Sequence, residues 1–112
     1  MKRTLVISGK EVEFKTSGGF PKFYRMFLHR EIFADLKALE KESWLEDGGM
    51  EVLEYVAYGM AKFANPKMDM SLDDWLDQFA MFGLTEALPD ITDMWLEEMD
   101  SKSDAKKKTE QQ

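Results

Sequence analysis

The sequence predicts an α+β fold that is mainly helical, with an N-terminal β-hairpin packed on a bundle of four to five helices. Two patterns support this prediction. Residues 4–7 and 11–15 are β-prone runs on either side of a glycine, and the second run alternates apolar and charged side chains, as half-buried strands do. Residues from about 21 to 99 carry apolar side chains at three- and four-residue spacing, as amphipathic helices do. The 112 residues fit one domain, which we place at residues 1–99, followed by a flexible charged tail at residues 100–112.

The hairpin is predicted from two β-prone runs, residues 4–7 and 11–15. In the second run, Val12 and Phe14 alternate with charged residues, and Gly9 supplies the positive φ that a tight turn usually needs. A lone hairpin is only marginally stable in water. We therefore expect the Val12 and Phe14 face to lie on the helices.

Residues 21–42 are predicted to be helical, with Pro21 in the first turn. The apolar stripe consists of Phe20, Phe23, Tyr24, Phe27, Leu28, Ile32, Leu36 and Leu39. Either one helix spans the region or two helices meet near His29 and Arg30. We favour a break at that point.

The segment from about residue 50 to 64 follows a connector that ends at Gly48 and Gly49. It is apolar on most sides, which is typical of a helix surrounded by other elements. We therefore place it at the centre of the bundle. Asn65 and Pro66 end it.

Two further helices are predicted before the tail. Ser71 has the form of an N-cap, because its oxygen can accept a free backbone N–H, and we expect its helix to end at Gly83. The last helix is predicted from about Thr85 or Pro89 to Met99. Its inward residues are predicted to be Leu88, Ile91, Met94, Trp95 and Met99.

Charge and composition exclude several classes of protein. The net charge is −7, and residues 40–104 alone carry −13, which repels nucleic-acid phosphate. No run approaches the roughly 20 apolar residues of a membrane helix. The apolar run near the N-terminus is too short for an export signal. We therefore expect a cytoplasmic protein that binds neither nucleic acid nor membrane.

No residue pattern supports catalysis, a cofactor or a metal. There is no cysteine, and His29 is the only histidine; we interpret it as a helix-end or surface residue. The acids Asp69, Asp73, Asp74 and Asp77 lack the spacing of a calcium loop. The sequence therefore predicts no enzyme.

Nine methionines suggest an adaptable apolar surface, although they also suit filling an imperfect core. Such a surface, flanked by acids, would accept an amphipathic helix with basic flanks. Our candidate partner-binding residues are Trp75, Phe79, Phe82, Met94, Trp95 and Met99.

Several segments, taken in order, resemble the tail assembly chaperones of long-tailed, siphovirus-type phages and prophages of Gram-positive bacteria. Their order and spacing carry the resemblance, which spans residues 4–99. The segments are residues 7–15 (ISGKEVEFK), 24–25 (YR), 33–36 (FADL), 57–62 (AYGMAK), 65–66 (NP) and 74–79 (DWLDQF), with Pro89 and Trp95.

The resemblance implies a binding protein. Such chaperones coat the tape measure protein, keep it soluble until tail tube subunits polymerise around it, and are absent from the finished particle. The family often makes a longer, frameshifted product that is thought to recruit the tail tube protein, and codons for Lys106–Lys108 could hold such a site. The alternatives are an acidic DNA-mimic inhibitor, suggested by the acidic region, and a small regulatory adaptor domain.

Overall fold

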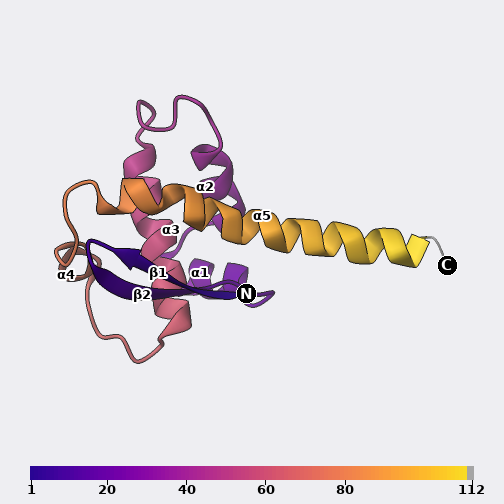
Figure 1. The fold of residues 1–112 in the computed structure, drawn as a ribbon, viewed down its shortest axis with the longest axis horizontal. Coiled ribbons are helices and arrows are strands. Elements are labelled where there is room, and N and C mark those ends of the chain that lie inside the picture. Colours follow the sequence, from indigo (N-terminus) through magenta and orange to yellow (C-terminus); the bar gives the residue numbers. More distant parts are fainter. Residues whose placement is uncertain (111–112) are drawn as a thin grey trace.

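The computed structural model describes the backbone of residues 1–110 and the side chains of residues 1–98. It confirms the predicted fold class, an N-terminal hairpin followed by helices (Figure 1). The described elements are β1 (Lys2–Ile7), β2 (Lys10–Lys15), α1 (Phe20–Leu28), α2 (Ile32–Leu39), α3 (Gly49–Ala64), α4 (Leu72–Leu76) and α5 (Gly83–Glu110).

The hairpin is antiparallel, and its register places Leu5 opposite Val12. Ser8 and Gly9 form the turn, with φ values of 52° and 78°. Two positive φ angles match a type I′ turn, whose twist suits the flanking strands. Ile7 and Phe14 are buried on the inner face, as the alternation predicts.

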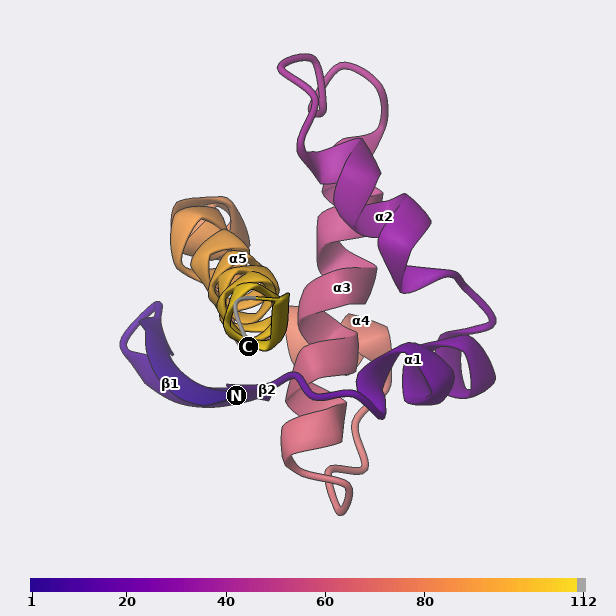
Figure 2. The same ribbon diagram turned by 90° about the vertical axis from the view of Figure 1, so that its right-hand side faces the viewer.

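The prediction that the segment near residues 50–64 lies at the centre is confirmed. In Figure 2 the hairpin and α5 lie on one side of α3, and α1 and α2 lie on the other. Leu53, Val56 and Met60 of α3 are fully buried. The prediction of a break near His29 is also confirmed, because His29 adopts left-handed backbone geometry there and its N–H donates to the Arg25 carbonyl at 2.8 Å.

The corner between α1 and α2 is held by one buried carboxylate. Asp35 of α2 accepts a hydrogen bond from the Tyr24 hydroxyl at 2.6 Å and two from the Arg30 guanidinium at 2.8 and 3.0 Å. Arg30 also lies over the Tyr55 ring of α3, 4.4 Å from its centroid. Through these contacts one side chain fixes the α1–α2 pair against the central helix.

The boundary between the last two helices differs from the prediction. Ser71 caps α4 as expected, accepting the Asp74 N–H at 3.2 Å. However, α4 ends at Leu76, and Gly83 begins α5 instead of ending α4. The N–H of Ala80 donates to Ser8 Oγ in the hairpin turn at 2.8 Å. This distant contact holds the intervening chain in a loop.

Pro89 lies inside α5, not in its first turn, because the helix starts earlier than expected. Residues 100–112 were predicted to be a charged tail outside the packed domain. The α5 backbone continues through Glu110 and, consistent with a tail, projects away from the globule (Figure 1). Residues 111–112 lie outside the described chain.

Candidate functional site

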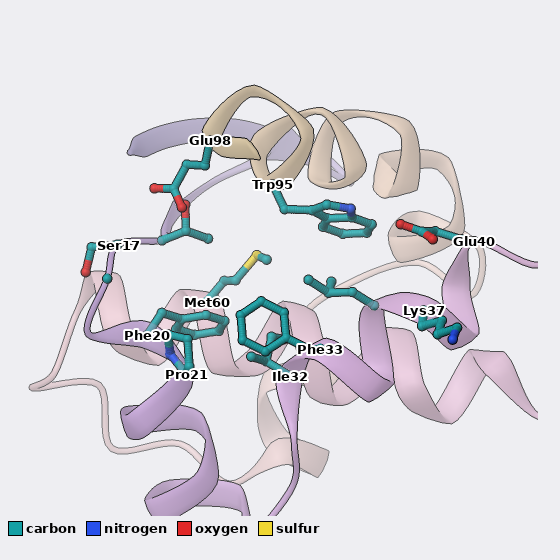
Figure 3. Close-up of a pocket in the computed structure, with 13 residues that line it drawn as sticks. Ser17, Phe20, Pro21, Ile32, Phe33, Lys37, Glu40, Met60, Trp95 and Glu98 are labelled. Atoms are coloured by element: carbon teal, nitrogen blue, oxygen red, sulfur yellow. The ribbon is translucent and has the colours of Figure 1, made fainter. Parts of the chain in front are cut away.

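The main cavity of interest lies between the loop after β2 and helices α1, α2 and α5, with Met60 of α3 at its base; we call it the α1–α2–α5 pocket. Its volume is about 310 Å³. Figure 3 shows its lining side chains. They are Thr16, Ser17, Gly18, Phe20, Pro21, Ile32, Phe33, Leu36, Lys37, Glu40, Met60, Trp95 and Glu98.

The walls of the pocket are apolar and its ends are charged. The Trp95 indole of α5 faces Phe33 of α2 across the cavity (Figure 3). Lys37 and Glu40 lie at one end, and Glu98 lies at the other. An apolar cavity with a few polar groups at defined positions is the usual form of a binding pocket.

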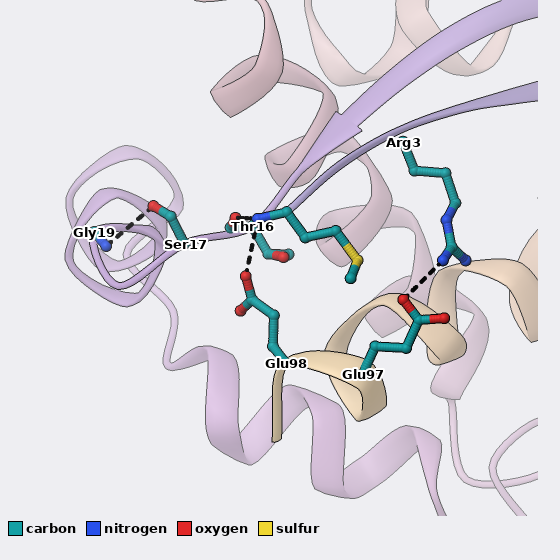
Figure 4. A network of polar contacts seen from close by, with 7 residues as sticks. Arg3, Thr16, Ser17, Gly19, Glu97 and Glu98 are labelled. Atoms are coloured by element: carbon teal, nitrogen blue, oxygen red, sulfur yellow. Dashed lines mark hydrogen bonds and ion pairs between the residues drawn. The ribbon is translucent and has the colours of Figure 1, made fainter. Parts of the chain in front are cut away.

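The Glu98 end is tied to the first strand by two ion pairs. Glu98 Oε1 lies 3.1 Å from the Met1 amino group, and Glu97 Oε2 lies 3.0 Å from the Arg3 guanidinium (Figure 4). The amide N–H of Thr16 also donates to the Met1 carbonyl at 2.8 Å. These contacts keep α5 beside the hairpin, so Trp95 is held over the pocket.

Two buried polar atoms on the pocket wall lack a hydrogen-bond partner among the described residues. They are Thr16 Oγ1 and Trp95 Nε1. Both side chains are almost fully buried, at 3% and 5% exposed. An unpartnered buried polar group costs about 1–3 kcal/mol. A bound partner that accepts from or donates to these atoms would explain why the folded protein keeps them.

The structure does not bring the sequence-predicted binding residues together on one surface. Trp75, Met94 and Trp95 are in the core, because the apolar stripes of α4 and α5 face inward. Phe79 is half-buried, and its ring lies nearly perpendicular to that of Trp75 with the ring centroids 5.0 Å apart. Phe82 is 62% exposed. The partner-binding role of this set stays a prediction, and among its described members only Trp95 lines the α1–α2–α5 pocket. The Met99 side chain lies outside the described residues.

Phe33 is the residue that sequence reasoning missed. It is 69% exposed and lies at the edge of the pocket. The available signal was its position on α2, outside the inward stripe of Ile32, Leu36 and Leu39. A phenylalanine on the outer side of an amphipathic helix is a candidate for contact with a partner.

Among the described residues, no group of three or more His, Asp or Glu side chains could hold a metal ion. Within the same part of the chain, no helix has the length and hydropathy of a membrane-crossing segment.

Comparisons with protein-family models, with curated proteins and with solved structures found no match to this chain. The site is therefore characterised by its own chemistry. It offers apolar walls, the Trp95 indole donor and the unpartnered Thr16 hydroxyl, which suit the binding of an apolar group.

Proposed function

We propose that this chain is a tail assembly chaperone of a long-tailed phage or prophage. It binds apolar helices of the tape measure protein, keeps that protein soluble and promotes assembly of the tail tube around it. The observation that carries the proposal is the open apolar pocket with exposed Phe33 at its edge, on a chain of net charge −7. The resemblance of residues 4–99 to that family supports the same function.

The physical reasoning starts from the partner. A long helix with an uncovered apolar stripe tends to aggregate. An acidic protein that covers the stripe adds net charge, and charge favours solubility. Contacts by single copies can be weak, because many copies act along one elongated partner.

The proposal places the protein in the cytoplasm of the host bacterium, where the tape measure protein is made. A longer product would contact the tail tube protein. Its existence depends on the codons for Lys106–Lys108, and an A-rich slippery heptamer in the gene would support it. Codons in which other bases interrupt the run of adenines would contradict the existence of the longer product.

Co-expression tests the function. The tape measure protein of the same phage is produced alone, with this chain, or with an unrelated acidic protein of similar size. We expect a larger soluble fraction and a co-purifying complex only with this chain. Equal solubility in all three cases contradicts the proposal, and capture of a nuclease from infected cells would favour the DNA-mimic alternative instead.

A further inference from the structure

We propose that the α1–α2–α5 pocket receives one large apolar side chain of a tape measure helix, and that Trp95 Nε1–H donates a hydrogen bond to an oxygen of the same helix. This inference rests on the proposed function and specifies how the partner is recognised. It is carried by the apolar walls of the pocket, the unpartnered indole donor and the net negative charge of the chain.

The pocket is large enough to receive an inserted side chain, since its volume is about 310 Å³. Phe20, Ile32 and Leu36 line it and offer water no hydrogen-bonding side-chain atoms. Replacing that water with a leucine, methionine or aromatic side chain is favourable, because apolar surface leaves water on both partners. Exposed Phe33 then covers the inserted group.

The indole donor adds specificity to this site. Trp95 Nε1 can only donate, and no described residue accepts from it. In Figure 3 the nitrogen edge of the ring is turned toward the end where Lys37 and Glu40 lie. The nitrogen is buried in the unbound chain, so this binding mode requires the indole to turn when a helix lies over that end and supplies a side-chain amide or hydroxyl oxygen, or the second lone pair of a backbone carbonyl. Either acceptor satisfies the buried N–H.

The charges distinguish a basic-flanked helix from other occupants. Glu40 is exposed and makes no ion pair with the described residues, although Lys37 lies at the same end, and Glu98 at the opposite end pairs with the Met1 amino group. The net charge of −7 repels the head group of a fatty acid or an anionic lipid. Two copies of a chain of net charge −7 also repel each other. A helix with a lysine or arginine one turn from its apolar side chain can reach Glu40, since residues three or four apart share one face.

The first test observes the donor directly. The full chain, labelled with ¹⁵N at tryptophan, is titrated with overlapping 20-residue peptides that cover the tape measure protein of the same phage. We expect the Trp95 indole resonance to shift on binding, while those of Trp44 and Trp75 act as internal references. A bound peptide that leaves the Trp95 resonance unchanged overturns the assignment of the donor.

The second test uses two exposed phenylalanines as a matched pair. Phe33→Ser alters the pocket edge, whereas Phe82→Ser alters a similarly exposed ring that does not line the pocket. We expect Phe33→Ser to weaken peptide binding by about tenfold or more, and Phe82→Ser to change it less than about twofold. Thermal unfolding of both variants checks that the fold is retained.

The outcomes separate the two proposals. If the unaltered chain binds the peptides but Phe33→Ser binds equally well, the pocket assignment fails and the chaperone function stands. The assignment also fails if the unaltered chain self-associates and the sole effect of Phe33→Ser is to produce monomers. In that case the pocket is occupied by a second copy of this chain and not by the tape measure helix. If the unaltered chain neither binds any peptide nor solubilises the tape measure protein, the proposed function itself fails.

Discussion

Asp35 shows how much one polar residue contributes to this small fold. Its carboxylate accepts from both Tyr24 and Arg30, and burial together with this hydrogen bond raises the pKa of the Tyr24 phenol. Asp35→Ala would leave both donors without their acceptor. We expect the free energy of unfolding to fall by about 2–4 kcal/mol in urea denaturation. Asp47→Ala, on the exposed connector, is the control and should have little effect on stability. Equal urea unfolding midpoints for the two variants would contradict the stabilising role of Asp35.

Glu54 gives the protein a predicted pH dependence. Its pKa is raised above the ordinary 4.5, first by desolvation and then by the nearby charges of Glu51 and Asp73. The folded state therefore holds this proton more tightly than the unfolded chain does. The resulting stabilisation is complete below the unfolded pKa and is lost as the pH rises through the folded pKa.

Glu54→Gln removes this titration. We expect the variant to be more stable than the original chain at pH 7, and the difference to shrink as the pH falls through the raised folded-state pKa and to vanish below the unfolded value of about 4.5. Urea unfolding across pH 3.5–8 measures it. The exposed connector substitution Glu46→Gln serves as the control, and a Glu54→Gln difference that stays constant with pH would disprove the prediction.

At the scale of elements, Gly59 sets the approach of α1 to α3. A Cβ at this position would lie 2.9 Å from Tyr24 Cδ1, and Tyr24 is held in place by Asp35. Alanine normally favours a helix by about 1 kcal/mol over glycine. Here we expect Gly59→Ala to lower the free energy of unfolding by about 1–3 kcal/mol, because the ring cannot move away. Gly18→Ala, which meets no atom within 4 Å, should be neutral in the same denaturation assay. A Gly59→Ala chain as stable as the original would show that the helices separate freely.

Elements with local signals were predicted well. The alternation of Val12 and Phe14, the Ser71 cap and the apolar surface of α3 all depend on neighbouring residues, and the structure confirms each. The start of α5 at Gly83 was not predicted, because the loop before it is held by Ser8. A contact across 72 residues leaves no periodic signal in the sequence.

At the scale of the whole molecule, the sequence could not place the candidate site. Trp75, Met94 and Trp95 are apolar whether they face α3 or a partner, so periodicity alone does not distinguish the two. The pocket is assembled from the loop after β2, two helices and the distant α5. Its unpartnered indole nitrogen becomes evident only when these parts are in place.

The pairing of Arg3 with Glu97 has a consequence for biosynthesis. Helix α5 packs on β1, so Ile7 of that strand has no cover from α5 until residues near 95 have left the ribosome. At about 5–20 residues per second, that delay is roughly 4–18 seconds. The nascent chain thus completes its folding late in translation, and the apolar side of β1 stays exposed to water until then.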